Sequence, residues 1–455
     1  MIPLAIIVYI VLSIVTDVIV FYYIGRWNRY NVFSPLRFLL ILMVLLLQIP
    51  AWVMAFSDRA IGHEFSIACG LVASAIVPLL VLLGSKLIPR PAITWRQWWQ
   101  QPLYYNPSHK IVAGLFCGVI VIGILLQVFV VGGFRGVPLV ANFLHPGQGA
   151  MLRDLREQAF KLQPLYVKYP IAFSRHVLSF VAVSVLVVLV VHKLRGRAWL
   201  VPILVLAVVN AAMQGAKDPP AAILLVALLT WLLVSGKRIR ARTIIVGFLV
   251  LSIFPLFFTL TRLGTSVTFN DIGRSYSLLS HRLFIAPASC VMSTFAYVPD
   301  ISGEFFYGRT INLWATVTGR ETAPLPNLVY LAWVPPGGSR TSFSNAAFYA
   351  DAWANFWWVG VVVISLLVGA FIGLFERIIL TSRKTLLSIA CLICMIVGAR
   401  QLISMPFTSW VLSDVGSITL LIVFLTKQSN VSDEGMDLLE AYAEEPPPFG
   451  EGQWA

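Results

Sequence analysis

The chain has 455 residues, of which 58% are hydrophobic and 12% charged, and its formal net charge is +13. The apolar residues fall in long blocks, which excludes a soluble globular protein and predicts a polytopic integral membrane protein. Four of the five cysteines lie inside apolar runs, so the sequence offers no disulfide framework. Neither HExxH nor another zinc spacing occurs, and we expect no metal site and no cofactor.

Apolar stretches of about 20 residues predict about eleven transmembrane helices in an all-α fold. They lie near residues 3–23, 38–56, 65–84, 111–131, 172–191, 199–216, 221–235, 243–261, 356–375, 385–403 and 408–426. Alternate loops are short and rich in Lys and Arg, and the positive-inside rule places these loops in the cytoplasm. The N-terminus is then outside and the C-terminus inside. The first span lacks a small-residue cleavage site, which indicates a retained helix.

The expected organisation is one transmembrane domain, residues 1–427, followed by an acidic tail, residues 428–455. The tail carries seven acidic residues and no Lys or Arg, which predicts a disordered cytoplasmic segment. Two outer loops are long, at about 132–171 and 262–355. The basic residues show no pairing with aromatic residues of the kind that binds nucleic acid, so we expect no nucleic-acid partner.

The larger outer loop contains six arginines and no lysine. Guanidinium groups bind phosphate and carboxylate oxygens bidentately, whereas lysine acts more as a point charge. The sequence therefore predicts an anionic ligand, with phosphate as the first candidate. The alternative is that some of these arginines pair with acids of the same loop or with lipid headgroups. The residues predicted to bind phosphate are Arg262, Arg274, Arg282, Arg309 and Arg340.

The segment "GRSYSLLSHRLFIAP" predicts a helix that Pro287 ends or kinks. Arg274, His281 and Arg282 stand at i, i+7 and i+8, on one face of that helix. His281 is therefore a candidate proton donor or acceptor, or a hydrogen-bonding ligand for an anion. The alternative is a structural histidine.

The segment 338–360, "GSRTSFSNAAFYADAWANFWWVG", places a carboxylate among aromatic residues at the start of a span. A helix here puts Ser344, Asp351 and Asn355 on one polar stripe. Asp351 is a candidate general base that activates a hydroxyl. The aromatic residues, including Tyr349 and Trp353, are suited to stacking on sugar rings and equally to an interfacial belt.

The turn "MQGAKDPPAA" places Lys217 beside Asp218 between two spans, either as a phosphate contact or as an ion-paired hairpin. Charged residues within spans are costly without a partner. Arg400 and Asp414 lie in neighbouring spans and form a candidate pair, whereas Asp17 in the first span has no assigned role. "GAFIG", residues 369–373, predicts close helix packing.

This arrangement resembles the Wzy-type oligosaccharide repeat-unit polymerases of bacterial polysaccharide assembly. The resemblance rests on the number of spans, on the two long outer loops and on two segments. "NAAMQGAKDPPAAILLVALLTWLL" is similar to the family's paired helices around a basic turn, with Lys217 where Arg is usual. "TSFSNAAFYADAWANFWWVGVVVISLLVGAFIG" is similar to its closing segment, in which Asn355, Phe356 and Gly360 hold the "N-F-x-x-x-G" places.

The resemblance implies a GT-C-like polymerase or ligase architecture in the bacterial inner membrane. It also implies transfer of a growing glycan from an undecaprenyl pyrophosphate carrier to the next lipid-linked repeat unit on the periplasmic face. Membrane lipids, a flippase and a chain-length regulator are the other implied partners. Two alternatives remain open: a ligase or another lipid-carrier-dependent glycosyltransferase, and a transporter of lipid-linked glycan.

Overall fold

The computed structural model describes residues 2–25, 33–51, 62–89, 91–104, 108–145, 148–156, 164–194, 196–215, 218–235, 247, 269–333 and 344–411. Within these ranges the protein is helical, and five helices are long and apolar enough to cross a membrane: Leu4–Ile24, Glu64–Lys86, Pro170–Val191, Phe348–Thr381 and Leu386–Ile403. Shorter apolar helices occupy Pro35–Ala51, Gly114–Val130, Leu200–Ala212 and Asp218–Val234. A multi-pass membrane protein is thus confirmed, whereas the predicted spans 243–261 and 408–426 lie almost wholly outside the described residues.

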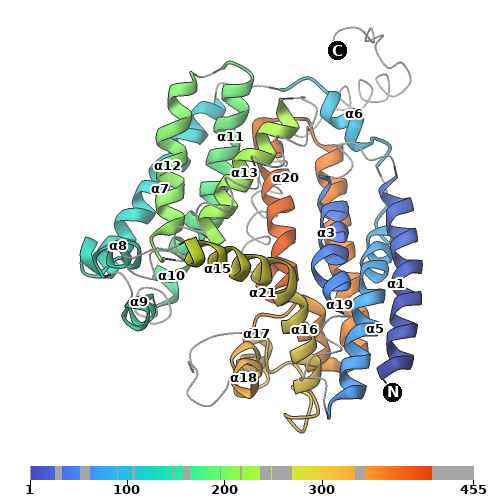
Figure 1. Cartoon of the computed structure of the whole chain (residues 1–455). Coiled ribbons are helices and arrows are strands. Elements are labelled where there is room, and N and C mark those ends of the chain that lie inside the picture. Colours follow the sequence, from blue (N-terminus) through green and yellow to red (C-terminus); the bar gives the residue numbers. More distant parts are fainter. Residues whose placement is uncertain are drawn as a thin grey trace.

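The helices form two groups (Figure 1). One group contains α1 (Ile2–Ile24), α3 (Pro35–Met43) with its π-helical continuation η1 (Val44–Gln48), α5 (Glu64–Lys86), α16 (Ala286–Tyr297) and α19 (Phe348–Thr381). The other contains α7 (Ser108–Val130), α10 (Leu165–Phe173), η5 (Ser174–Leu178), α11 (Ser179–Val191), α12 (Leu200–Ala212) and α13 (Asp218–Val234). Helix α20 (Leu386–Ala399) packs against α3 of the first group and against α11 and α13 of the second, so it joins the two.

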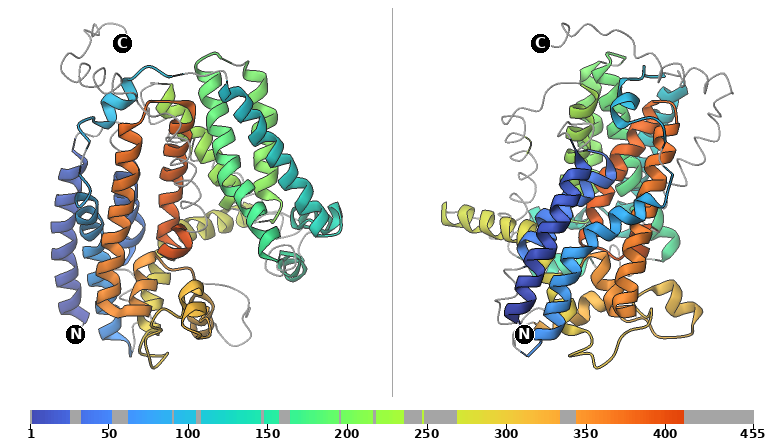
Figure 2. Two further views of the ribbon diagram at one scale, coloured as in Figure 1. Left: turned by 180° about the vertical axis from the view of Figure 1, so that it is seen from behind. Right: turned by 90° about the vertical axis from the view of Figure 1, so that its right-hand side faces the viewer.

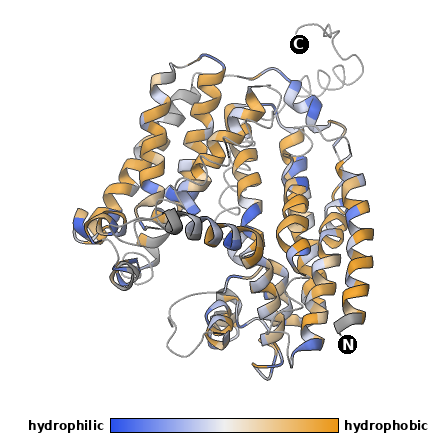
Figure 3. Cartoon of the chain, viewed as in Figure 1, coloured by the Kyte–Doolittle hydropathy of each residue, from blue (hydrophilic) through white to orange (hydrophobic). Residues whose placement is uncertain are grey.

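The shorter elements gather at opposite ends of the bundle, as Figure 2 also shows. The α18 end carries α8 (Pro138–Leu144), α9 (Gly149–Arg156), α17 (Asn312–Val317) and α18 (Leu325–Trp333). Helix α15 (Phe269–Ser280) lies at a steep angle to the long helices and projects outward from the bundle, as the right-hand view of Figure 2 shows. The α6 end carries α6 (Trp95–Gln100) and the turns that join α11 to α12 and α19 to α20. Apolar residues dominate the long helices, and polar residues concentrate near the two ends (Figure 3).

Helices α5 and α19 pack with their backbones in direct proximity, as the small residues of "GAFIG" predict. A Cβ atom at Gly369 would lie 2.0 Å from the carbonyl oxygen of Val81, and one at Gly84 would lie 2.1 Å from that of Leu366. No side chain fits at such distances, so glycine permits this approach. The prediction that this segment serves helix packing is confirmed.

At the α6 end, Lys384 holds the C-terminus of α6. Its ammonium group donates to the carbonyl oxygens of Trp99 (2.6 Å) and Gln101 (3.1 Å), which lie where a helix leaves its last carbonyls unpaired. Burial lowers the pKa of Lys384 to about 8. Burial and the neighbouring Lys384 also lower the pKa of His192, in the turn after α11.

Candidate functional site

Helix α19 is broken where the sequence passes from its polar start to its apolar run. Phe356 (φ −138°, ψ 20°) and Trp357 (φ 54°, ψ −144°) depart from helical geometry, and the second conformation is rare for any residue with a side chain. A Cβ atom at Gly360 would lie 2.2 Å from the carbonyl oxygen of Ala352, so only glycine fits the following turn. The "N-F-x-x-x-G" segment therefore encodes this break. It separates an eight-residue helical segment, 348–355, from the helix that follows, and it lies where the predicted span 356–375 begins.

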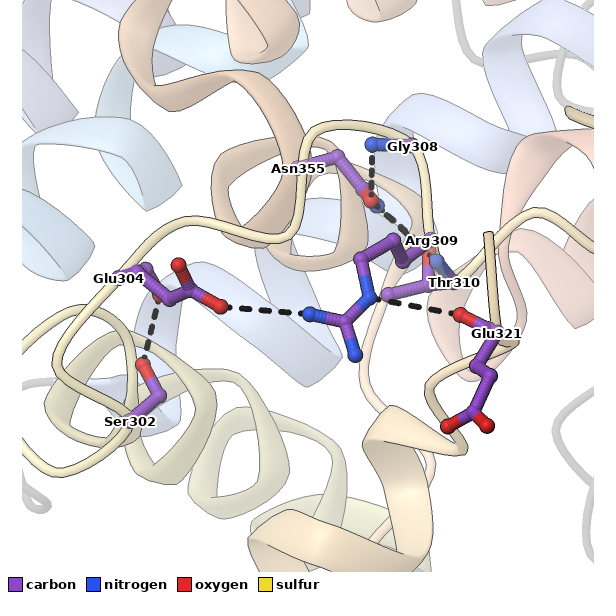
Figure 4. Close-up of polar contacts among 7 residues, drawn as sticks. All are labelled: Ser302, Glu304, Gly308, Arg309, Thr310, Glu321 and Asn355. Carbon is purple, nitrogen blue, oxygen red and sulfur yellow. Dashed lines mark hydrogen bonds and ion pairs between the residues drawn. The ribbon is translucent and has the colours of Figure 1, made fainter. Parts of the chain in front are cut away.

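Asn355 fixes the loop that follows α16 to this segment (Figure 4). Its side chain is 1% exposed, and its Oδ1 accepts hydrogen bonds from the backbone N–H groups of Gly308 (2.9 Å) and Thr310 (3.5 Å). Its Nδ2 donates to the hydroxyl of Thr310 (2.5 Å) and to the carbonyl of Asp351 (2.8 Å). One amide thus connects two stretches of chain 45 residues apart. We call residues 304–321 the anchored loop.

The backbone of the anchored loop completes the same attachment. Phe306 N–H donates to the carbonyl of Ala354 (2.9 Å), and Tyr307 N–H donates to the carbonyl of Asn355 (3.0 Å). These carbonyls stand at the end of the first segment of α19, where the break removes their helical partners. The loop therefore acts as the cap of that segment.

Asp351 lies inside this attachment rather than on an open surface. Its side chain is 9% exposed, and its Oδ1 accepts a hydrogen bond from the Thr310 hydroxyl (2.9 Å), while its Oδ2 lies 3.5 Å from Nδ2 of Asn355. Its geometry is that of a carboxylate that positions Thr310 and the anchored loop. The hypothesis that Asp351 itself removes a proton from a substrate requires the substrate to reach this buried carboxyl.

Arg309 is the predicted phosphate ligand whose surroundings the structure describes most fully. Its Nη1 lies 3.2 Å from Oε1 of Glu304, and its Nε donates to the carbonyl oxygen of Glu321 (3.4 Å) (Figure 4). The alternative stated for these arginines, pairing with acids of the same loop, therefore holds for Arg309. Its side chain is still 33% exposed.

His281 and Arg282 begin η7 (His281–Ile285), the π-helical turn that joins α15 to α16. All five residues of η7 are at least partly exposed, and both His281 and Arg282 are among the exposed ones. Pro287 occupies the first turn of α16, so the predicted change of direction before this proline is confirmed. Arg274 lies on α15, but its side chain is outside the described part of the chain, as are Arg262, Arg340 and Lys217.

Tyr349 and Trp353 correct the sequence analysis. Each is 1% exposed, so neither presents a ring face to a sugar. The Tyr349 hydroxyl lies 2.8 Å from that of Ser74, and Trp353 stacks on Phe295 at 4.7 Å. Trp353 Nε1 also donates to the carbonyl of Val298. They belong to the core because segment 348–355 is covered by the anchored loop and by α16.

The polar stripe of the sequence analysis is also shorter than expected. Ser344 precedes the helix, which begins at Phe348, and its backbone N–H donates to the carbonyl of Pro326 (2.8 Å). Asp351 and Asn355 share the stripe, since both face the anchored loop. Arg400 pairs with both carboxylate oxygens of Asp218 (2.8 and 2.9 Å), so Asp218 links α13 to the end of α20.

A buried polar cluster in the second helix group was missed by the sequence analysis. Arg175 is 6% exposed on η5, where Nε donates to the ring of His176 (3.0 Å) and Nη1 donates to Oε1 of Gln214. Asn210, which is near Gln214 in the sequence, accepts a hydrogen bond from the Gln127 side chain (2.9 Å) and donates one to the Ser179 hydroxyl (3.1 Å). The signal available in the sequence was an arginine inside the apolar run 172–191.

Within the described ranges, no group of three or more His, Cys, Asp or Glu side chains is arranged to hold a metal ion. The described residues therefore offer two exposed groups, the guanidinium of Arg282 and the imidazole of His281, at the junction of α15 and α16. Such groups neutralise an anion and accept a proton. Comparison with models of protein families, with curated proteins and with solved structures gave no match to this chain.

Proposed function

We propose that the protein polymerises lipid-linked oligosaccharide repeat units, by transferring a glycan from an undecaprenyl pyrophosphate carrier to the next lipid-linked repeat. The observation that carries the proposal is the exposed pair His281 and Arg282 at the end of α15. A titratable ring and a permanent cation follow one another in the sequence where α15, which projects from the bundle, joins α16. A substrate with an apolar tail and a pyrophosphate head needs a cation at such a place.

In the proposed reaction, the bond between the anomeric carbon and the pyrophosphate oxygen breaks, and the bonding electrons leave with the lipid pyrophosphate. A hydroxyl oxygen of the acceptor sugar forms the new bond to that carbon. The proton of that hydroxyl passes to the imidazole of His281. Arg282 stabilises the charge that develops on the leaving group, because a guanidinium binds phosphate oxygens bidentately. The chain's own groups supply this chemistry without a cofactor.

Asp351 has a supporting role in this proposal. Together with Asn355 it holds the anchored loop, which carries Arg309 toward the α18 end. Phe356 and Trp357 are available to stack on sugar rings, since these residues, at the break in α19, are 37% and 48% exposed. We propose these two residues in place of Tyr349 and Trp353 as the stacking surface.

We place the α6 end in the cytoplasm and the α18 end in the periplasm of a bacterial inner membrane. The α6 end contains Arg96 on α6, Lys193 in the turn between α11 and α12, and Arg383 and Lys384 in the turn between α19 and α20. Short basic loops mark the cytoplasmic side of a multi-pass protein. The N-terminus of α1 then faces the periplasm, where lipid-linked repeat units become accessible after export.

The buried cluster of Arg175, His176 and Gln214 favours one second candidate, a transporter of anionic lipid-linked glycan. A charged residue inside a span marks a substrate path in many membrane proteins. The two candidates differ in their products, because a transporter forms no covalent bond.

The experiment is a polymerisation assay with purified protein in liposomes and a panel of undecaprenyl pyrophosphate oligosaccharides. The proposal predicts a ladder of products spaced by one repeat unit. Arg282→Ala and His281→Ala should each reduce its formation about a hundredfold or more, as expected when a charge-stabilising or proton-transferring group is lost. A single transfer to a different acceptor would indicate a ligase. Movement of intact lipid-linked glycan across the bilayer without bond formation would replace the enzyme by a transporter.

A further inference from the structure

The anchored loop presents two large aromatic side chains at its surface. Tyr307 is 57% exposed, and Trp314, on α17, is 50% exposed. Helices α17 and α18 lie beyond the ends of α12 and α20 (Figures 1 and 2). Residues 318–322, which follow α17, are all exposed, and they are Thr, Gly, Arg, Glu and Thr. The two rings are therefore set in a polar surface rather than in the apolar surface of the long helices.

The backbone of Tyr307 adopts a conformation that suits another kind of residue. Its φ is 49°, in the left-handed region that glycine and asparagine adopt readily and an aromatic residue adopts rarely. Asn355 holds this turn, since its carbonyl accepts the N–H of Tyr307 (3.0 Å) and its Oδ1 accepts that of Gly308 (2.9 Å). A ring that lies in solvent adds little to folding, so folding does not explain an aromatic residue here. Residues held in such conformations cluster at active sites and ligand sites.

Trp314 lies against the same turn. A Cβ atom added to Gly308 would lie 2.3 Å from Cδ1 of Trp314 and 2.7 Å from its Nε1, so glycine lets the indole approach the backbone. The carbonyl of Trp314 accepts both the N–H (2.9 Å) and the hydroxyl (2.8 Å) of Thr318, which fixes the backbone that carries the indole. Because Tyr307 directly precedes Gly308, one fixed turn carries the first ring and supports the second.

Polar groups suited to sugar hydroxyls follow directly. Arg309 comes after Gly308, and its guanidinium is held by Glu304 (3.2 Å) and by the carbonyl of Glu321 (3.4 Å), while 33% of its side chain stays exposed (Figure 4). A sugar ring presents C–H bonds on its faces and hydroxyls at its edge. The face of an aromatic ring is electron-rich and attracts such C–H bonds, whereas a guanidinium donates hydrogen bonds to the hydroxyls. Aromatic side chains with a few fixed polar groups are typical of sites for small organic ligands.

We propose that Tyr307 and Trp314 stack on sugar rings of the glycan, and that Arg309 binds the hydroxyls of these sugars. The inference rests on the proposed function, which supplies a glycan on the α18 side of the membrane. The pair His281 and Arg282 precedes α16, whereas this turn follows it, so glycan binding and bond transfer use different residues. The turn adds to the two aromatic residues proposed for stacking at the break in α19.

The test is binding of lipid-free oligosaccharides to the purified full-length protein in detergent, measured by isothermal titration calorimetry. The probe is prepared by partial acid hydrolysis of the surface polysaccharide of the cells that carry this chain. We expect saturable binding that Trp314→Ala weakens about tenfold, as the loss of one stacked ring implies, and that Trp314→Phe largely keeps. The matched control is Trp199→Ala, which removes a tryptophan of similar exposure (51%) at the α6 end and should leave the affinity unchanged.

Tyr307→Asn separates binding from folding. Asparagine adopts the left-handed conformation more readily than tyrosine, so this variant should melt at the wild-type temperature or above it. It lacks the ring, so the oligosaccharide should bind about tenfold more weakly. A lower melting temperature together with unchanged affinity would show that the ring serves packing, and would overturn its assignment to the glycan.

The binding assay and the polymerisation assay fail independently. No saturable binding, or equal affinity of the wild-type protein and both ring variants, would overturn this proposal, and equal affinity is the result that an aromatic belt at the lipid interface predicts. Ring-dependent binding without a ladder of products would retain the glycan site and remove the proposed reaction. A ladder of products without ring-dependent binding would retain the reaction and remove this site.

Discussion

Replacing Asn355 by Ala tests the attachment of the anchored loop to α19. The substitution removes three hydrogen bonds between Asn355 and the loop: from the backbone N–H groups of Gly308 (2.9 Å) and Thr310 (3.5 Å) to its Oδ1, and from its Nδ2 to the Thr310 hydroxyl (2.5 Å). A buried hydrogen bond contributes about 1 kcal/mol, so the loop should lose about 3 kcal/mol of local stability. Apart from segment 348–355 of α19, the long helices take no part in these hydrogen bonds, so the loop should open while the bundle stays folded.

Hydrogen exchange measured by mass spectrometry reports this opening directly. A loss of about 3 kcal/mol corresponds to exchange about a hundredfold faster at the amides of Phe306, Tyr307 and Gly308, with unchanged exchange in α5 and α20. Asn345→Ala is the matched control, because Asn345 is exposed just before α19 and should leave the loop protected. Unchanged exchange in residues 304–321 of Asn355→Ala would refute the attachment.

Two further predictions concern the bundle itself. Gly369→Ala brings a Cβ within 2.0 Å of the Val81 carbonyl oxygen and should lower the free energy of unfolding by about 1–3 kcal/mol. Thermal unfolding in detergent measures this loss. The control is Gly118→Ala, whose added Cβ meets nothing within 4 Å and should not destabilise the protein. The pKa of Lys384 is about 8 in the folded protein, below its unfolded value of 10.5, so unfolding takes up a proton between these two pH values. The free energy of unfolding should therefore rise with pH in this range, by up to about 3 kcal/mol. Lys384→Met should remove this rise, and a pH profile identical to that of the wild-type protein would contradict the assignment.

The spans could be predicted because a membrane requires long apolar helices and little else. Tight packing through Gly369 was equally accessible, since small residues at that spacing have few other uses. The break at Phe356 and Trp357 was not, because a run of aromatic and apolar residues also fits a continuous helix. The break is stabilised by hydrogen bonds from Asn355 to a loop 45 residues away in the sequence, which local sequence patterns do not reveal.

The candidate site was predicted in part. Local sequence identified Asp351, His281 and Arg282 as unusual, and the structure separates the buried carboxylate from the exposed pair. The partners of Asp351 could not be foreseen, because Thr310 and Gly308 are ordinary loop residues whose roles arise from a long-range contact. Tyr349 and Trp353 were assigned to the surface because hydropathy alone does not distinguish an interfacial aromatic residue from one covered by a loop.

The most direct test of the proposed function is the amount of undecaprenyl pyrophosphate released per repeat unit added, measured in liposomes with a defined lipid-linked repeat. The account predicts one carrier released for each glycosidic bond formed, with release lost in Arg282→Ala and retained in Arg320→Ala, which removes an exposed arginine of the anchored loop. Release without bond formation, or full activity of Arg282→Ala, would contradict the assignment of this chain as a polymerase that works through the end of α15.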